Sequence, residues 1–294
     1  MLRQKLRSLH SRNVHRDGYD FPALIRSCPE LEDYTFHNVQ GNLSIDFANP
    51  SAVKVLNAAL LKHHYGIDYW DFPDEHLCPP IPGRVEYIHI LKDLLDASDI
   101  REERTILDIG TGATCIYPLL GNSTYGWNFI GCDVDEHSLQ NAQKIINKNQ
   151  LQDVVELRLQ KHPKHILRDI INPSEVITAT LCNPPFYKNE AEAIANTSRK
   201  LKGLGKSSEA TIRNFSGTAK ELWYPGGEER FLKHYMTESA EFRSNVRWFT
   251  SLVSRKDYVR PMKVVLKKLG VKEVKVLDLS LGNKKSRVVA WTFR

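Results

Sequence analysis

The sequence predicts an α/β protein with a doubly wound, mostly parallel sheet that ends in an antiparallel hairpin. Three observations lead to this fold class. From residue 104 onward, short apolar runs alternate with helical patterns, which is typical of βαβ units. A glycine-rich turn follows the first of these runs, where such sheets bind ligands. Near the end of the chain, two strand-like segments flank Gly282-Asn283, a pair that favours a tight turn.

Residues 1–83 are predicted to form an N-terminal arm and a small helical module that bind RNA, and residues 84–294 the doubly wound domain. Residues 44–47 alternate like a short strand, and apolar positions at helical spacing predict an amphipathic helix over 51–65. The segment 66–84 is rich in proline and aromatic residues, so we expect an ordered loop. A second helix is predicted over 84–97.

Within the domain, strands are predicted at 105–109, 127–134, 154–159, 177–182 and 246–253, and helices at 136–149 and 227–243. A further helix is expected to begin near Pro261, because proline is favoured in the first turn, and to stop at Gly270. Segments 271–279 and 286–293 then form the hairpin.

The composition, with 41% hydrophobic and 26% charged residues, is that of a soluble globular protein. No apolar run approaches the ~18 to 20 residues of a membrane helix, and the first residues lack the apolar segment of a secretory signal. The five cysteines form no CxxC pair, and the eleven histidines show no metal-ligand spacing. We therefore expect an intracellular protein in a reducing compartment, without a membrane partner or a metal, and favour a monomer.

Basic residues are concentrated in two segments. Residues 1–16 hold no acid, which leaves 36 basic against 35 acidic residues in the remainder; the basic residues of this arm include Lys5, Arg7, Arg12 and Arg16. Such an arm can neutralise phosphates and favours a nucleic-acid partner, although a solvated tail is the alternative interpretation. The second segment is a long loop, 188–222, which is either a functional lid or disordered; its basic residues include Arg199, Lys200 and Lys202.

The glycine turn points to an adenosine-bearing cofactor. In DIGTG, Asp108, Gly110 and Gly112 lie where the first strand of the domain passes into a helix, so a ligand can approach the backbone closely. The dinucleotide fingerprint fails, because its third glycine is Cys115. Asp133 ends the next strand ~20 residues later, where an acid commonly binds ribose hydroxyls. S-adenosylmethionine carries a ribose but no pyrophosphate and fits both observations.

The tetrapeptide Asn183-Pro184-Pro185-Phe186 forms a rigid corner after a predicted strand, because two successive residues lack an N–H group and have a fixed φ. The side-chain carbonyl of Asn183 and the backbone carbonyl of Pro184 offer two acceptors to one exocyclic amine, and Phe186 offers a stacking face for a planar base. This pattern predicts methylation of an NH2 group. The alternative interpretation is a purely structural turn that ends the strand.

Taken together, DIGTG, the strand-end acid and NPPF resemble the class I S-adenosylmethionine-dependent N6-adenine methyltransferases, which have a Rossmann-like fold. More narrowly, six segments in order are similar to the eukaryotic U6 small nuclear RNA adenosine-N6 methyltransferases and their bacterial relatives that act on 23S ribosomal RNA. The segments are HSRNVHRD, DFPALIRSCPEL, RVEYIHILKDLL, DIGTGATCIYPLLG, NPPFY and GGEERFLKHYMTES, and the similarity runs from about residue 8 to the C-terminus.

The resemblance implies roles for individual residues. Arg84 reaches the cofactor carboxylate, Gly110 and Thr114 lie in the cofactor loop, Asp133 binds the ribose, and Asn183 with the rest of the tetrapeptide is catalytic. The resemblance also implies that the arm around Arg12 and Arg16 and the loop around Arg199 and Lys200 contact a structured RNA, most simply a U6 hairpin with a UACAGAGA-type site, and that the protein is nuclear. The loop is poorer in arginine and proline than that of the family. Animal members also extend past the position of Arg294, so the chain resembles a compact fungal-type member or an excised catalytic domain.

Three alternatives remain open at this point. An RNA-binding protein could keep this fold without turnover, and a protein glutamine N5-methyltransferase presents the same amide chemistry to an NPP corner, usually with tyrosine at the position of Phe186. A DNA adenine methyltransferase is the third, and contacts to the ribose 2′-OH distinguish it from an RNA enzyme.

Overall fold

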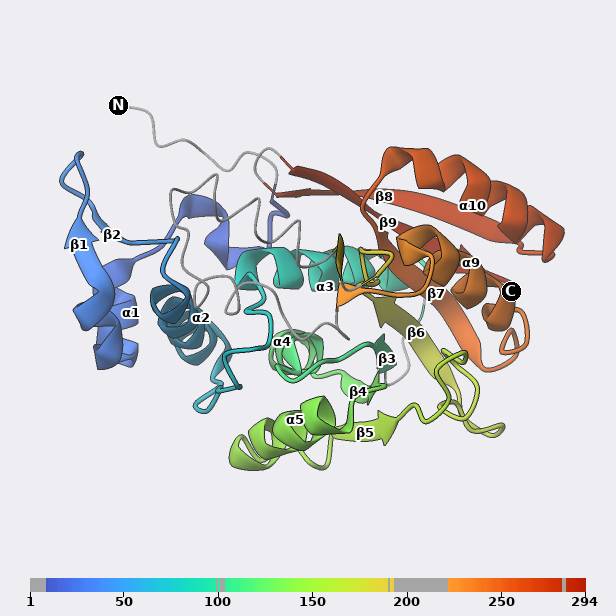
Figure 1. Ribbon diagram of the computed structural model, residues 1–294, viewed down its shortest axis with the longest axis horizontal. Coiled ribbons are helices and arrows are strands. Elements are labelled where there is room, and N and C mark those ends of the chain that lie inside the picture. Colours follow the sequence, from blue (N-terminus) through green and yellow to red (C-terminus); the bar gives the residue numbers. More distant parts are fainter. Residues whose placement is uncertain (1–8, 99, 101–103, 190, 193–221, 282–283) are drawn as a thin grey trace.

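The computed structural model describes residues 9–98, 100, 104–189, 191–192, 222–281 and 284–294, and it confirms the predicted fold class. Its main sheet has the strand order β5-β4-β3-β6-β7-β9-β8 (Figure 1). The first five of these are parallel: β5 Val155–Leu159, β4 Asn128–Asp133, β3 Thr105–Ile109, β6 Ile177–Cys182 and β7 Val246–Val253. The antiparallel pair is β9 Lys284–Thr292 and β8 Glu273–Leu281. Because β3 and β6 are neighbours, the strand order reverses between them, and such a switch point is where these sheets bind ligands.

Helices cover both faces of this sheet (Figure 1). Along the chain the long helices are α2 Pro50–Tyr65, α3 Ile81–Asp96, α4 Ile116–Tyr125, α5 Glu136–Lys148, α9 Gly227–Ser239 and α10 Lys256–Lys268. Alternate residues of each strand enter two separate cores, because side chains alternate across a strand. Along β9, Val288 and Ala290 join the core beneath α2 to α5, whereas Val289 and Trp291 join the core beneath α9 and α10.

The N-terminal part is built from short elements that pack into the core beneath α2 to α5. They are the 3-10 helices η1 Val14–Asp17 and η2 Pro29–Tyr34, the helix α1 Phe21–Ser27, and a two-stranded hairpin of β1 Thr35–His37 and β2 Leu43–Ile45. Leu31, Ile45 and Leu60 belong to the same apolar cluster as Ile106 of β3. The proposed division at residue 83 falls inside α3, whose buried face contacts both parts.

Most predicted elements are confirmed within a few residues, and the exceptions have local causes. The helix expected to begin near Pro261 begins at Lys256, so that Pro261 lies inside α10. Its ring removes one N–H donor early in the helix, where the loss costs one intrahelical bond and the helix continues. The strand predicted at 44–47 ends at Ile45, and its partner β1 is too short to show a pattern. The hairpin of β8 and β9 pairs Leu281 with Lys284; residues 282–283 lie outside the described residues.

No helix among the described residues is both long enough and apolar enough to cross a membrane. All five cysteines are unpaired thiols.

Candidate active site

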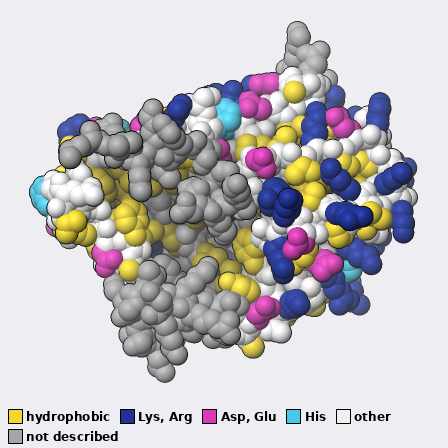
Figure 2. All heavy atoms as spheres, turned by 90° about the horizontal axis from the view of Figure 1, so that it is seen from above, with side chains coloured by type: hydrophobic (Ala, Val, Ile, Leu, Met, Phe, Trp, Pro, Cys, Tyr) yellow, Lys and Arg dark blue, Asp and Glu magenta, His cyan; other side chains and the backbone are white. Residues whose placement is uncertain are grey.

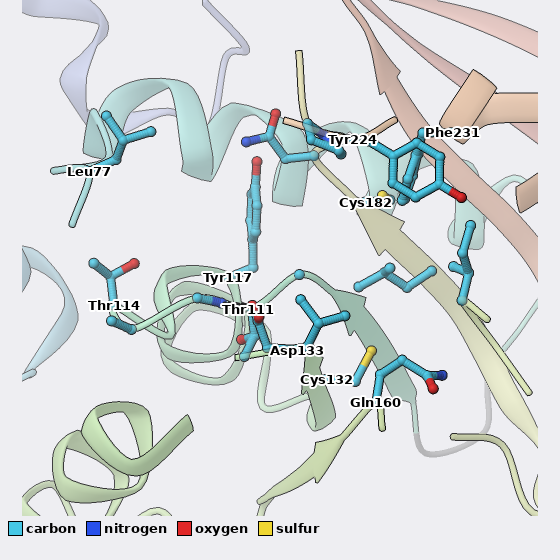
Figure 3. A pocket seen from close by; sticks show the side chains of 18 of the residues that line it. Leu77, Thr111, Thr114, Tyr117, Cys132, Asp133, Gln160, Cys182, Tyr224 and Phe231 are labelled. Carbon is cyan, nitrogen blue, oxygen red and sulfur yellow. Dashed lines mark hydrogen bonds between the residues drawn. The ribbon is translucent and has the colours of Figure 1, made fainter. Parts of the chain in front are cut away.

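A cavity of about 410 Å³ opens at the carboxyl edge of the sheet, around the ends of β3, β4 and β6 (Figure 3). Residues from these three strand ends line it together, although they are far apart in the sequence. The predicted site residues that line it are Arg84, Gly110, Gly112, Thr114, Asp133, Asn183 and Pro185. Three others, Asp108, Pro184 and Phe186, do not line it.

The glycine turn after β3 exposes backbone to this cavity. Gly110 and Gly112 have φ values of +77° and +63°, in the left-handed region that glycine enters at least cost. The N–H groups of Gly110 and Thr111 donate to the carbonyl oxygen of Cys132 at 2.9 and 3.0 Å, which fixes the turn against the end of β4. Cys115, at the position of the missing third glycine, also has a positive φ of 50°. The turn therefore has the shape of a ligand-binding loop even without that glycine.

Asp133 is held still at the mouth of the cavity (Figure 3). Its Oδ2 accepts a hydrogen bond from the N–H of Gly112 at 2.9 Å, and its Oδ1 accepts one from the N–H of Asp135 at 3.0 Å. A carboxylate oxygen has a second lone pair, so each oxygen can still accept from a ligand hydroxyl. The backbone oxygen of Asp133 accepts from Gln160, a further lining residue, at 2.8 Å.

Asp108 lies behind the turn in the interior of the sheet, with only 1% of its surface exposed. Burial raises the pKa of its carboxyl group to about 7, while the nearby Thr111 side chain and Arg84 oppose the rise and Asp133 adds to it. Asp108 makes no ion pair within the described part of the chain. It is a buried acid next to the turn that a cofactor would contact.

The NPPF corner is fixed by the segment that precedes α9. After the two prolines, the N–H groups of Phe186 and Tyr187 both donate to the carbonyl oxygen of Leu222 at 3.0 Å, and the N–H of Tyr224 donates back to Tyr187 at 3.0 Å. The first two free donors after the prolines are thus immobilised. The Phe186 side chain remains 41% exposed beside the cavity mouth, which leaves a ring face accessible to a planar ligand.

Arg84 of α3 links the corner to α4. Its Nη1 donates to the hydroxyl of Tyr117 at 2.9 Å, and its guanidinium lies over the Tyr117 ring at 5.4 Å from the centroid. With the Asn183 amide oriented so that its oxygen faces Arg84, that oxygen accepts from Nη1 at 3.0 Å and from Nη2 at 3.2 Å. The Nε donor of Arg84 is buried and has no hydrogen-bond partner among the described residues. One cationic side chain therefore contacts both Tyr117 of α4 and Asn183 of the NPPF corner.

Several lining residues were not predicted from the sequence. Tyr117 of α4, Tyr224 of the segment before α9 and Phe231 of α9 line the cavity (Figure 3). The loop before α3 supplies Leu77 and Pro79. A second loop, after β5, supplies Gln160, Pro163, His165 and Ile166. These residues give an apolar wall to the cavity. Their aromatic and apolar spacing does not differ from that of core residues, so only the proline-rich composition of 66–84 indicated that this loop is special.

Two of the residues predicted to contact RNA, Arg12 and Arg16, lie among the described residues. Arg12 packs against α3: its Nη2 pairs with Asp93 of α3 at 2.5 Å, and its guanidinium lies over the Tyr125 ring. Arg16 is exposed and donates to the backbone oxygen of Ser11 at 3.4 Å. The other predicted residues lie outside the described residues: Lys5, Arg7, Arg199, Lys200 and Lys202. Among the described residues, no cluster of three or more potential ligands for a metal ion occurs.

The arm is anchored by a buried carboxylate. Glu86 of α3 is 3% exposed and accepts the backbone N–H of His10 at 2.8 Å and the side-chain amide of Asn13 at 2.8 Å. His10 also contacts Asp93 through Nε2 at 2.8 Å. Residues 10–13 are therefore held on the same helix that carries Arg84.

The fold and this cavity define a class I S-adenosylmethionine-dependent methyltransferase. The sheet order, the glycine turn, the strand-end acid and the NPPF corner occur together at the switch point, and the buried Nε donor of Arg84, which has no partner among the described residues, would suit an anionic group of the cofactor. Comparison with known proteins gives the particular family. The family model described as RNA methyltransferase matches residues 3–294, and the chain belongs to that family. The protein is therefore an S-adenosylmethionine-dependent RNA methyltransferase, as the resemblance predicted.

Curated relatives and solved structures agree. The chain is 47% identical over 294 residues to the ribosomal RNA large subunit methyltransferase F of Pseudomonas entomophila, covering 97% of this chain and 93% of the relative. It is 49% identical to the protein of the same name from Serratia proteamaculans, covering 99% and 89%. The structure of the hMettl16 catalytic domain in complex with the MAT2A 3′UTR hairpin 1 has a TM-score of 0.82 at 30% identity, with 98% and 96% coverage. The N-terminal domain of human METTL16 in complex with SAH has a TM-score of 0.77 at 29% identity, with 97% and 99% coverage.

These comparisons correct one expectation. The relatives at 47% and 49% identity are bacterial proteins, and bacteria have no nucleus, so the expected nuclear localisation is wrong. It had been transferred from eukaryotic members of the family. The same relatives are named for ribosomal RNA, so they give no support to a U6 target.

Proposed function

We propose that the protein transfers a methyl group from S-adenosylmethionine to N6 of one adenosine in large-subunit ribosomal RNA. One observation carries this proposal: Asn183 and Pro185 of the corner line the same cavity as Gly110, Gly112 and Asp133. The group that donates the methyl and the amine that receives it would thus meet in one cavity at the end of β6. The 47–49% identity to ribosomal RNA large subunit methyltransferases over nearly the whole chain supports the choice of RNA.

The cofactor residues divide by chemistry. The bare backbone at Gly110 and Gly112 lets the cofactor lie close to the turn, and the fixed carboxylate of Asp133 would accept hydrogen bonds from the ribose hydroxyls. Arg84 would bind the cofactor carboxylate with its guanidinium fork, using the donor that has no partner among the described residues. Thr114 is held in this loop through its backbone oxygen, which accepts from the indole N–H of Trp70 at 3.0 Å. Asp108 would support the cofactor turn from behind, buried in the sheet and outside the cavity lining.

The catalytic corner would act on the exocyclic amine. S-adenosylmethionine supplies an electrophilic methyl group on a sulfonium. The lone pair of N6 is delocalised into the adenine ring, so acceptors that bind both amine hydrogens favour the tetrahedral nitrogen needed for attack. The side-chain oxygen of Asn183 and the backbone oxygen of Pro184 are such acceptors, and Phe186 would stack on the base. As the N–CH3 bond forms, the S–CH3 bond breaks with its electron pair kept by sulfur, and N6 then releases one proton to water.

The contact between Arg84 and Asn183 connects the two halves of this site. With the Asn183 amide oriented so that its oxygen faces Arg84, that oxygen accepts from both Nη atoms of Arg84. A guanidinium that turns toward a cofactor carboxylate would release that oxygen for the substrate amine. The catalytic acceptor would therefore become available once the cofactor is in place.

The RNA would be held outside the cavity. The base has to leave its stack to enter a pocket of this depth, and an aromatic wall with a basic surround favours such a splayed nucleotide. The arm up to residue 16, with Lys5 and Arg7, would contact phosphates of the RNA on one side of the flipped nucleotide. The basic loop 188–222 would contact phosphates on the other side through Arg199, Lys200 and Lys202. We assign residues up to 83 to RNA binding and residues 84–294 to catalysis, with α3 contacting both parts.

The choice of RNA can be tested with labelled S-adenosylmethionine. Protein-free bacterial large-subunit ribosomal RNA and a U6 hairpin with a UACAGAGA site are each incubated with the full chain at equal nucleotide concentration. We expect label in the ribosomal RNA at a rate at least tenfold above that in the hairpin. Preferential labelling of the U6 hairpin would reverse the assignment of substrate, and labelling of neither RNA, with cofactor bound, would overturn it.

A further inference from the structure

A stripe of basic residues runs along the solvent-exposed face of α10. Lys256, Arg260, Lys263 and Lys267 follow one another at spacings of four, three and four residues, which places them on one side of a helix. All four are exposed. We call these four residues the α10 stripe. With 13 residues, α10 is about 20 Å long, so the stripe is an extended surface and not a point.

The opposite side of α10 explains why the helix is held in place. Met262 and Leu266 are buried in the core beneath α9 and α10, and Val259 and Leu269 pack against it. The helix is therefore amphipathic, and its apolar side is packed within the protein; beside the basic stripe, Val264 is a single apolar residue that is 51% exposed. The basic side is the one left for a partner.

The α10 stripe has no compensating acid. Residues 255–272 contain seven basic residues and one acid, Asp257, which pairs with Arg255 at 3.8 Å. Within the described part of the chain, no carboxylate forms an ion pair with any residue of the stripe. Like charges at spacings of three and four residues repel each other and oppose helix formation. Folding alone gives no reason for this arrangement, whereas an anionic partner would relieve it.

The stripe begins at the same edge of the sheet as the cavity. Its first residue, Lys256, follows closely on the end of β7, which is parallel to β6 and so ends at the same edge. The N–H of Ser254 donates to Glu228 at 2.7 Å, which ties the start of α10 to the start of α9. Two exposed basic residues of α9, Arg230 and Lys233, flank the cavity residue Phe231 in the sequence.

Figure 2 shows lysine and arginine side chains gathered over the part of the molecule formed by α9 and α10. Because α9 supplies both the cavity residue Phe231 and the basic residues Arg230 and Lys233, the surface offers a path for one polyanion. A chain that enters the cavity with one nucleotide can run from Arg230 and Lys233 onto the α10 stripe.

We infer that the α10 stripe binds backbone phosphates of the substrate RNA at a distance from the methylated base. This inference rests on the proposed RNA substrate and adds a second, sequence-independent contact to it. Lysine and arginine at regular spacing along a helix fit a row of phosphates, and each phosphate that they neutralise releases counterions. RNA is favoured over an anionic membrane because α10 presents charge without a free apolar face, and membrane-surface helices need both.

The test compares two triple variants of the full chain. In the first, Arg260, Lys263 and Lys267 are replaced by glutamine. In the second, the matched control, Lys144→Gln, Lys148→Gln and Arg243→Gln remove the same charge from exposed positions of α5 and of the turn before β7. Binding of protein-free large-subunit ribosomal RNA is measured over a series of salt concentrations, and cofactor affinity and Tm are measured alongside.

The stripe variant should bind the RNA at least about tenfold more weakly at physiological salt, and the slope of log K against log salt should fall by about 2 to 3, as expected for three lost phosphate contacts. Its cofactor affinity should match that of the native chain, and its Tm should not fall, because like-charge repulsion is removed. The control should bind RNA as the native protein does.

Equal losses in both variants would show a general charge effect and overturn the inference, as would an unchanged affinity and slope in the stripe variant. Native binding to vesicles of anionic phosphatidylglycerol that the stripe variant loses, with RNA affinity kept, would assign the surface to membranes. If the native chain binds S-adenosylmethionine but no RNA, the proposed function itself fails, and the inference fails with it.

Discussion

Replacement of Asp108 by asparagine should stabilise the protein more at alkaline than at acidic pH. The carboxyl group is buried within β3, and burial raises its pKa to about 7 in the native state. In the unfolded chain the ordinary pKa is 3.8. The contribution of Asp108 to the free energy of unfolding is therefore largest below about pH 4, where the group is protonated in both states. It falls as the pH rises toward 7, because the unfolded chain ionises and the native protein does not. Asparagine has nearly the same shape and cannot ionise.

The size of the effect follows from the two pKa values. Between pH 5 and pH 8, a group that titrates at 3.8 when unfolded and about 7 when folded costs roughly 2 to 3 kcal/mol of stability. For a chain of this length, 1 kcal/mol corresponds to about 2 °C in Tm. The Tm of the variant minus that of the native protein should thus be about 5 °C more positive at pH 8 than at pH 5.

Calorimetric melting of both proteins in buffers of equal ionic strength measures this difference directly. The matched control is Asp153→Asn, at an exposed position after α5, which should give the same Tm difference at both pH values. A Tm difference for Asp108→Asn that does not change between pH 5 and pH 8, or that changes in the opposite direction, would refute the argument from burial.

Three further substitutions separate the roles of neighbouring residues. Asn183→Ala should lower turnover on the order of 10²-fold or more while cofactor and RNA affinities stay near native values, because a positioning acceptor is lost; a weakened RNA affinity of similar size would instead indicate a binding role. Arg84→Lys should raise the KM for S-adenosylmethionine at least tenfold, because a single ammonium cannot replace the fork that reaches Tyr117 and Asn183; an unchanged KM would remove Arg84 from the cofactor site. Glu86→Ala should cost about 2 kcal/mol of stability and expose residues 9–18 to protease, because the donors of His10 and Asn13 lose a buried carboxylate. Native resistance to protease would show that the arm is held by other contacts.

The sequence predicts the central sheet well because its strands are short apolar runs separated by helical patterns. It also predicts that Gly112, Asp133 and Asn183 lie close together, because the carboxyl ends of parallel strands share one edge. These predictions depend on local patterns and on one topological rule. The N-terminal module is harder, because its contacts link residues that are far apart, such as Arg12 and Asp93.

The cavity wall and the charged surface illustrate what pattern alone cannot supply. Tyr117 and Phe231 occupy positions that would be core positions in any amphipathic helix, and only the fold turns them toward a cavity. The overall balance of 36 basic and 35 acidic residues outside the arm conceals the local excess on α10, because acids elsewhere compensate for it in the sum. The expected helix start at Pro261 failed for a similar reason: packing of Val259 and Tyr258 extends the helix toward its N-terminus past the local preference of proline.

The most direct test of the account is the identity of the methylated nucleoside. Large-subunit ribosomal RNA labelled by the native chain is digested completely to nucleosides, and the products are separated, beside the same reaction with Asn183→Ala. The account predicts that the label is recovered as N6-methyladenosine, in equal amount to the S-adenosylhomocysteine formed, and that the variant yields almost none. Label in a ribose-methylated or ring-methylated nucleoside, or undiminished N6-methyladenosine from the variant, would contradict the assignment of the NPPF corner as the site of amine methylation.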